Sequence, residues 1–352
     1  MHARSEVAYP VARHSNATFY PSRATIVRMA ARQHDVVALP HDHVVNFYDA
    51  DADLVEAVSW FTAEGLRADA PVLVIATDAH RDAIDATLVD EGIDVACARL
   101  SGRYVCLDAA ETLSRVTVGA SPDPSRLRSI IEPLASAAVD TDRPLRVFGE
   151  MVALLWDTGD VTRAIELEGL WNVLARDYRF SLYCAYPISS LATHDDLTAT
   201  GQVCSQHSHV IPPVSYSTLA TGPAVDDAFQ RSQLFVPVAE AVRFARQFVA
   251  TTLRAWSRDD LVSDAAIVAS ELATNAVLHA NSPFRVSLQR RDACIEIAVH
   301  DVSPLLPRHL HPEPRQGGGR GLTLIDRLST EWGVERSREG KVIWSQFDRS
   351  PS

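Results

Sequence analysis

The stretch PVLVIATDAHRDAIDATLVDEG, residues 71–92, carries the pattern that decides the fold of the first half of the chain. Residues 71–76 form an apolar run, which is typical of a strand buried on both faces of a parallel sheet. Residues 78–92 then place apolar side chains at helical spacing, and Gly92 is suited to ending that helix. The same strand and helix unit recurs from residue 43 to Pro187, so the sequence predicts an α/β domain with a mainly parallel sheet.

From about residue 235 the pattern changes to two helices, a hairpin, a further helix and two more strands. The helices are expected at 239–256, 259–280 and 321–329, and the strands at 284–291, 294–301, 332–337 and 341–347. One antiparallel sheet covered by one layer of helices accounts for this order. The sequence therefore predicts an α+β sandwich for the second half.

These patterns divide the chain into four parts. Residues 1–40 show neither strand nor helix periodicity, and we expect a disordered arm there. Residues 41–190 form the expected α/β domain, and residues 233–348 form the expected α+β domain. Between them, residues 191–232 are rich in Ser, Thr, Pro and Gly, which is typical of a linker.

The charge of the chain argues against nucleic acid or an anionic membrane as a partner. The chain carries 33 Lys+Arg and 45 Asp+Glu, a formal net charge of −12, so it has no global attraction for polyanions. The acidity lies in the first part, because residues 1–232 hold 18 basic and 31 acidic residues, whereas residues 233–352 hold 15 and 14. The five cysteines form no CxxC pair, and no apolar run suits a membrane span or a signal peptide. We expect a cytoplasmic protein.

The segment ELATNAVLHA, residues 271–280, is the sharpest candidate for a functional site. On a helix, Glu271, Asn275 and His279 lie on one face, one turn apart, while the other positions are mainly apolar. Such a polar stripe either faces water or lines a site, and the helix alone does not decide between these alternatives.

The residues that follow this helix favour a site. A strand ends in Asp301, and the run QGGGRGLTLI, residues 316–325, leads Gly-rich backbone directly into a helix. Backbone amide groups at a helix N-terminus bind phosphate. The carboxylate and amide of the stripe, the aspartate and the Gly-rich turn together predict a site for a metal ion and a phosphorylated ligand.

Residues 233–348 resemble the GHKL ATPase superfamily, in particular the anti-sigma-factor serine/threonine kinases, through the ExxxN, Asp and GGGRGL motifs. The resemblance implies that Asn275 holds Mg²⁺ on the phosphates of ATP, that Glu271 is the general base, and that Asp301 accepts a hydrogen bond from the adenine amino group. In the last strand, where a threonine often assists adenine binding in the family, this sequence has Lys341, Val342 and Ile343. The resemblance further implies nucleotide binding by Gly317, Gly319, Arg320 and Gly321.

Residues 42–190 resemble the MEDS (methanogen/methylotroph sensory) domain, through HVVNFYDADADLVEAV, PVLVIATDAHRDAI and, most specifically, GEMVALLW. The resemblance implies a fold like that of RecA-type ATPases. No lysine occurs in this half to clamp a phosphate, so the domain is expected to be a degenerate core that uses the crevice at its strand ends for a small-molecule signal. Glu150 and His43 are the candidate residues of that sensory pocket; the alternatives are a helix-capping glutamate and a surface histidine.

Two pairs of histidines lie in expected loops, His207 with His209 and His309 with His311. The sequence shows no third ligand near either pair, so it does not favour a metal site there. The tryptophans are expected in the core rather than in a ligand box.

Together these features predict a signalling regulator that couples a sensory domain to an ATP- and Mg²⁺-dependent protein kinase. Its substrate would be a serine or threonine of an anti-anti-sigma protein of the STAS type, and a sigma factor is a further expected partner. A different class of function stays open, namely an ATP-gated binding protein that sequesters a partner without phosphoryl transfer. We find no helix with the phosphoacceptor histidine of a two-component kinase, and the sequence leaves open whether the chain forms a homodimer.

Overall fold

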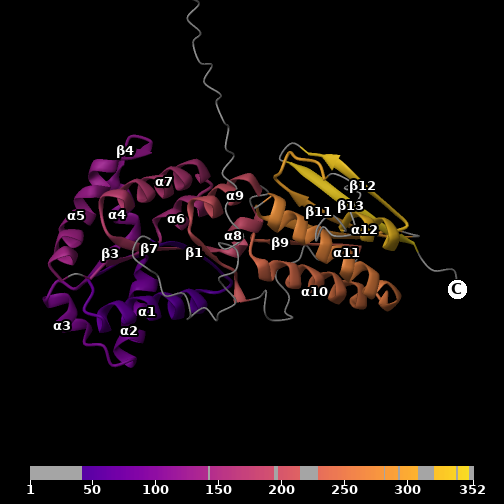
Figure 1. Cartoon of the computed structure of the whole chain (residues 1–352). Coiled ribbons are helices and arrows are strands. Elements are labelled where there is room, and N and C mark those ends of the chain that lie inside the picture. Colours follow the sequence, from indigo (N-terminus) through magenta and orange to yellow (C-terminus); the bar gives the residue numbers. More distant parts are fainter. Residues whose placement is uncertain are drawn as a thin grey trace, which may run out of the picture. The chain divides into compact units, whose positions relative to one another are not determined.

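The computed structural model describes residues 42–141, 143–193, 197–214, 229–280, 282–291, 294–307, 321–337 and 340–348. They form two domains, each with its own sheet (Figure 1). The arm expected at 1–40 lies outside the described residues.

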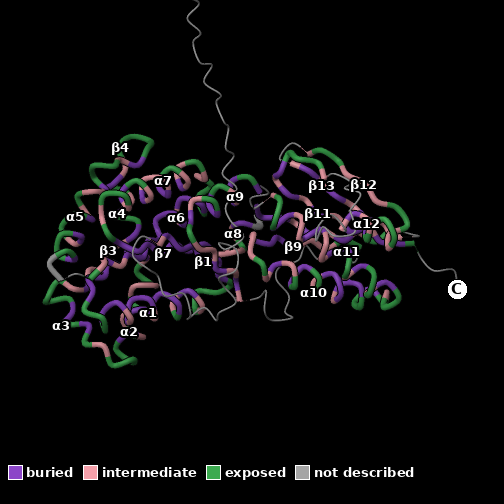
Figure 2. Tube along the Cα trace, in the orientation of Figure 1, coloured by how far each residue is buried: buried purple, intermediate pink, exposed green. Residues whose placement is uncertain are grey.

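The first domain is built on a six-stranded sheet in which every neighbouring pair is parallel. Its strand order is β3-β2-β6-β7-β1-β8. All residues of β1 and β2 are buried, because helices cover both faces of the sheet (Figure 2). The expected α/β architecture is confirmed. The strands are β1 (His43–Tyr48), β2 (Val72–Ala76), β3 (Tyr104–Asp108), β6 (Leu145–Gly149), β7 (Phe180–Pro187) and β8 (His209–Ile211).

The helices of this domain follow from capping residues and apolar faces. Asp94, Asp108 and Asp160 each accept a backbone N–H three residues on, which fixes the start of a helix. Trp156 and Trp171 are fully buried, as expected for core residues. The helices are α1 (Asp51–Arg67), α2 (Asp78–Asp90), α3 (Val95–Leu100), α4 (Ala109–Val116), α5 (Pro124–Thr141), α6 (Met151–Asp157), α7 (Val161–Asp177), α8 (Ile188–Thr193) and α9 (Leu197–Gln206), with a small hairpin of β4 (Thr117–Val118) and β5 (Ser121–Pro122).

The domain limits expected from the sequence need correction at both ends of the linker. Helix α9 and strand β8 lie within 191–232, yet β8 pairs with β1 and so belongs to the first sheet. Strand β9 (Gln230–Phe235) pairs with β10 of the second sheet, so that domain begins before residue 233. Both strands are edge strands. β8 has only three residues, and β9 begins with four polar residues, a composition that resembles that of a loop.

The second domain has a five-stranded antiparallel sheet in the order β12-β13-β11-β10-β9. Buried residues alternate with half-exposed ones along β10, β11 and β13, because helices cover only one face of the sheet. The expected α+β sandwich is confirmed. The remaining elements are α10 (Ala239–Ala255), α11 (Val262–Asn275), β10 (Phe284–Arg290), β11 (Cys294–Asp301), α12 (Gly321–Leu328), β12 (Glu331–Arg336) and β13 (Lys341–Asp348).

One described helical segment, Asp259–Ala280, is long and apolar enough to cross a membrane by length and composition alone. Its residues Val268, Leu272 and Ala273 are buried in the core of the second domain. This is weak evidence for a membrane span, because the central helix of a soluble domain has the same composition.

Candidate functional site

The polar stripe of the second domain lies on α11. Glu271 and Asn275 are half-buried, and His279, a turn further on, is exposed. Asn275 is the last α-helical residue, because the helix widens into a π-turn over 276–280. Such π-turns are frequent at functional sites. The stripe is thus neither a fully solvated face nor part of the core.

The start of α12 lies against this stripe. A Cβ atom built on Gly321 would lie 2.7 Å from Oε2 of Glu271. The glycine therefore lets the N-terminus of α12 approach the Glu271 carboxylate. The role that the resemblance implies for Gly321, close approach of the phosphates, stays a prediction. Gly317, Gly319 and Arg320 lie outside the described residues, so their phosphate-binding roles stay predictions.

Asp301 is buried at the end of β11 and belongs to an ion pair that the sequence reading missed. Its Oδ1 accepts a hydrogen bond from Lys341 Nζ at 2.7 Å and another from the Ser303 amide at 2.8 Å. Lys341 is also buried, at the start of β13, where it is the register partner of Asp301. The signal was available, because Lys341 is the single lysine of the chain and takes the place of a residue expected near adenine.

These residues fit a Mg²⁺-bound nucleotide in most respects. Glu271 and Asn275 supply a half-buried carboxylate and amide one turn apart, and the N-terminus of α12 approaches the carboxylate at Gly321. Asp301 is an acceptor whose Oδ1 is engaged by Lys341 and Ser303. Asn275 would hold the metal, and Asp301 would contact the base.

Glu150 lies at the carboxyl ends of the parallel strands and caps a helix. Its carboxylate accepts hydrogen bonds from the Thr77 amide at 2.8 Å and from His80 Nδ1 at 2.7 Å. Thr77 is the N-cap residue of α2, so Glu150 supplies the anion that a helix N-terminus favours. The hydrogen bond to Glu150 raises the pKa of His80 above its usual value. The alternative of a helix-capping glutamate is thus realised, although at α2 rather than at the helix that follows Glu150.

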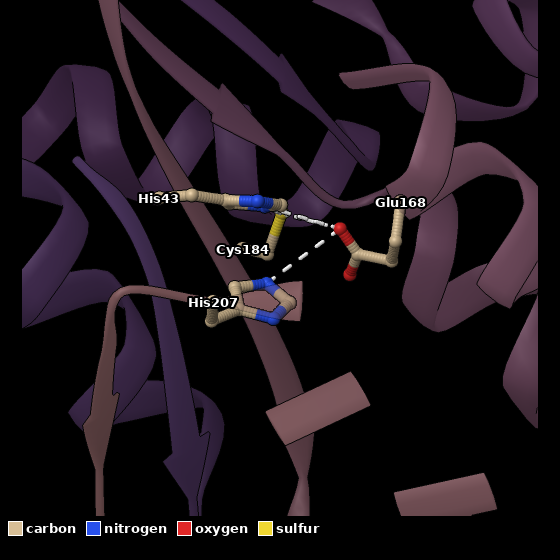
Figure 3. A group of neighbouring side chains, drawn as sticks. All are labelled: His43, Glu168, Cys184 and His207. Carbon is tan, nitrogen blue, oxygen red and sulfur yellow. Dashed lines mark hydrogen bonds and ion pairs between the residues drawn. The ribbon is translucent and has the colours of Figure 1, made fainter. Parts of the chain in front are cut away.

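His43 is buried rather than on the surface, and it lies beneath the sheet with three other side chains. Figure 3 shows His43, Glu168, Cys184 and His207 converging on one point. Burial lowers the pKa of His207 to about 4 and raises that of the Cys184 thiol well above its usual value. Burial also raises the pKa of Glu168, but His207, His43 and the Tyr186 hydroxyl outweigh this effect and lower it overall.

The sequence did not predict Glu168 or Cys184 as site residues, and it showed no further metal ligand near His207. One signal could have found Glu168. It occupies the buried face of α7 together with Ala164, Leu167 and Trp171, and a charged residue on an apolar helix face needs a partner. Cys184 and His207 join it only through the pairing of β1 with β7 and β8.

The comparisons with known families agree with both halves of this description. Residues 42–200 match the family model described as MEDS, the methanogen/methylotroph, DcmR sensory domain. Residues 235–347 match the model of the histidine kinase-like ATPase domain. The chain is a fusion of a MEDS domain and a histidine kinase-like ATPase domain. No curated protein matches the chain. The MEDS match ends at residue 200, within α9, whereas β8 of the same sheet follows it at His209–Ile211.

Proposed function

We propose that the chain is a cytoplasmic signalling regulator whose MEDS domain controls an anti-sigma-factor type of serine/threonine kinase. The kinase would use ATP and Mg²⁺ to phosphorylate an anti-anti-sigma protein of the STAS type, and a sigma factor would be a second partner. The close approach of the α12 N-terminus to Glu271, for which Gly321 leaves the space, is the single observation that supports it best, because the Gly-rich run ends beside the proposed base.

The roles of the residues follow from their chemistry. Bound Mg²⁺ would neutralise phosphate charge, and Asn275 would hold it. The Glu271 carboxylate, half-buried beside the N-terminus of α12, would take the proton of the attacking hydroxyl. Phosphoryl transfer depends mainly on positioning and charge neutralisation, so this small set of groups is sufficient.

The test is transfer of labelled phosphate from ATP to a purified STAS protein encoded near this chain, with the full-length protein as enzyme. Glu271→Gln should lower the transfer rate by about 10²- to 10⁴-fold and leave ATP affinity nearly unchanged, because the variant loses only the base. Glu331→Gln is the matched control, since it makes the same change at an exposed site on the edge strand β12.

Equal transfer rates for wild type and Glu271→Gln would contradict the role of Glu271. ATP binding without transfer by the wild type would favour the other class of function, a protein that sequesters its partner under the control of ATP.

A further inference from the structure

Four potential metal ligands from separate segments converge inside the MEDS domain. His43 begins β1, Glu168 lies on α7, Cys184 lies in β7, and His207 follows α9. His43 is the register partner of Leu182, so Cys184, two residues on, lies on the same face of the sheet. All four residues are buried, and their ligand atoms lie within 4.8 Å of one another (Figure 3).

Four of the distances between the ligand atoms are close to those around a tetrahedral zinc ion. Oε2 of Glu168 lies 3.1 Å from His43 Nε2, 3.5 Å from Cys184 Sγ and 3.6 Å from His207 Nε2. His43 Nε2 lies 3.4 Å from Cys184 Sγ. Zinc bonds are about 2.0–2.2 Å to nitrogen or oxygen and about 2.3 Å to sulfur, so tetrahedral ligand atoms lie about 3.3–3.6 Å apart.

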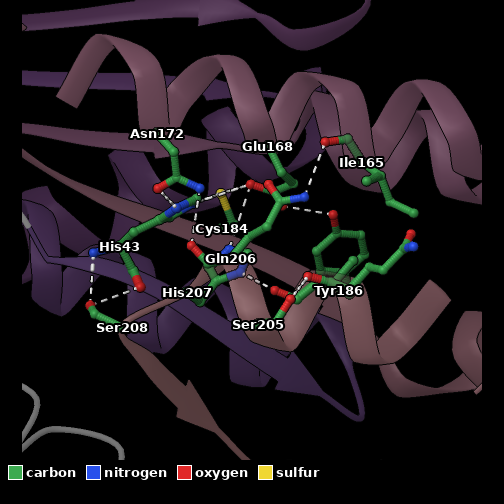
Figure 4. A network of polar contacts seen from close by, with 12 residues as sticks. His43, Ile165, Glu168, Asn172, Cys184, Tyr186, Ser205, Gln206, His207 and Ser208 are labelled. Carbon is green, nitrogen blue, oxygen red and sulfur yellow. Dashed lines mark hydrogen bonds and ion pairs between the residues drawn. The ribbon is translucent and has the colours of Figure 1, made fainter. Parts of the chain in front are cut away.

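The other contacts of these residues orient their ligand atoms toward the same point (Figure 4). His207 Nδ1 donates a hydrogen bond to the Val203 carbonyl oxygen at 2.6 Å, which leaves the Nε2 lone pair facing the cluster. His43 Nδ1 donates to Asn172 Oδ1 at 3.1 Å, with the same result. Metal-binding histidines typically donate their second ring N–H to an oxygen in this way.

The buried carboxylate of Glu168 also favours a bound cation in this cluster. The ion pairs of Glu168 in the described part of the chain are those to the two histidines. His207 Nε2 is buried and makes no hydrogen bond. A dication with one carboxylate, one thiolate and two neutral imidazoles would be electrically neutral, whereas an unpaired buried charge is costly.

We propose that His43, Glu168, Cys184 and His207 bind one divalent transition metal ion, and that zinc fits this set of ligands best. On binding, Cys184 gives up its thiol proton to solvent and coordinates as a thiolate. The ion would tie α9, through His207, to α7 and to two strands of the sheet. This site lies on one face of the parallel sheet, and none of its four residues belongs to the ATPase domain.

The experiment measures zinc in the full-length protein, with any affinity tag removed. The wild type should hold about one zinc ion per chain after dialysis against zinc and then buffer. Glu168→Gln and Cys184→Ser should hold little or none. His209→Gln is the matched control, because this half-exposed histidine lies two residues from His207 and outside the cluster. It should retain the zinc content of the wild type.

The spectrum of bound cobalt(II) supplies a second readout. It is measured on the wild type, so it remains informative even where the ligand variants do not fold. The cobalt-loaded wild type should show a thiolate-to-cobalt absorption band and the strong visible bands of tetrahedral cobalt. Asn172→Ala, which removes the acceptor for His43 Nδ1, should weaken zinc binding about 10- to 100-fold and keep the cobalt spectrum. A wild type that takes up no zinc, a cobalt spectrum without the thiolate band, or folded Glu168→Gln and Cys184→Ser proteins with full zinc content would overturn the proposal.

Discussion

At the scale of single residues, the Asp301–Lys341 pair is the clearest departure from what the sequence reading expected of the ATPase site. Both side chains are buried, at 1% and 4% exposure, and they are joined at 2.7 Å. Breaking a buried pair leaves an uncompensated charge, and removing both charges avoids that cost. We therefore expect the stability of this site to depend on the pair, and the proposed adenine acceptor, Asp301, to depend on it as well.

Asp301→Asn should destabilise the protein by about 3–5 kcal/mol, because it leaves the Lys341 ammonium buried without a counterion. The double variant Asp301→Asn with Lys341→Met should be less destabilised than the single one. Urea denaturation of both variants measures the difference. Equal or greater destabilisation of the double variant would mean that the two charges do not stabilise each other.

The same Asp301→Asn variant should change which base is preferred. The substitution replaces a hydrogen-bond acceptor by an amide that can also donate. It should therefore weaken the binding of ATP more than the binding of inosine triphosphate, whose base lacks the amino group. Equal losses for the two nucleotides would leave Asp301 with a structural role at the strand end.

His80 should make the stability of the MEDS domain depend on pH. Its hydrogen bond to Glu150 raises the pKa of His80 in the folded state, so the folded protein binds this proton more tightly than the unfolded chain does. The resulting stabilisation is present below the unfolded pKa of about 6.5 and is lost as the pH rises through the higher folded value. The difference in unfolding free energy between wild type and His80→Gln should therefore be larger near pH 6 than near pH 8. A difference that is the same at both pH values would contradict this origin.

The sequence predicted the site residues that follow local patterns and missed those that depend on strand pairing. Glu271 and Asn275 were proposed because they are one helical turn apart, and Asp301 because it ends a strand; their roles stay predictions. Lys341 meets Asp301 only through the register of β11 with β13. The cluster of His43, Cys184 and His207 likewise depends on pairing of strands that are far apart in the chain.

At the scale of elements, two glycines inside helices of the MEDS domain should respond to alanine in opposite ways. Gly65 lies in α1, and a Cβ atom there would lie 2.8 Å from Val72 Cγ2 and 2.8 Å from Arg146 Cδ. Gly169 lies in α7, where the nearest atom would be 3.9 Å away. Gly65→Ala should lower the free energy of unfolding by about 1–3 kcal/mol through overpacking. Gly169→Ala should raise it by about 0.4–1 kcal/mol, because alanine reduces the conformational entropy of the unfolded chain. Thermal denaturation measures both; the same sign for both variants would contradict the packing described.

Elements with a clear apolar pattern were predicted well. The strands β2 and β7 and the helices α1 and α7 follow such patterns. Helix α3, the β4–β5 hairpin and strand β8 were missed, because a few residues without a distinct apolar run cannot establish a period. Strand β9 was missed because four of its six residues are polar. Edge strands also carry polar residues, so their composition resembles that of loops.

At the scale of the whole molecule, the chain joins a MEDS domain to an ATPase domain, and we propose that the two are coupled. If the MEDS domain regulates the kinase, ATP affinity should differ between the full chain and residues 229–352 alone, because coupling between sites is reciprocal. The acidity of the first part of the chain suggests electrostatic contacts, so the difference should shrink as salt screens charges beyond about 10 Å at 0.1 M. Identical affinities at low and high salt would mean that the MEDS domain acts on partners rather than on the ATPase domain.

The central claim is that α11 carries a Mg²⁺-dependent ATP site, and calorimetric titration of the full-length protein with ATP tests it most directly. The wild type should bind ATP only in the presence of Mg²⁺, and so should Gln230→Ala, a control that removes an exposed amide on the edge strand β9. Asn275→Ala should lose this Mg²⁺-dependent binding, because it removes the amide placed to hold the metal. Unchanged ATP affinity in Asn275→Ala would contradict the account.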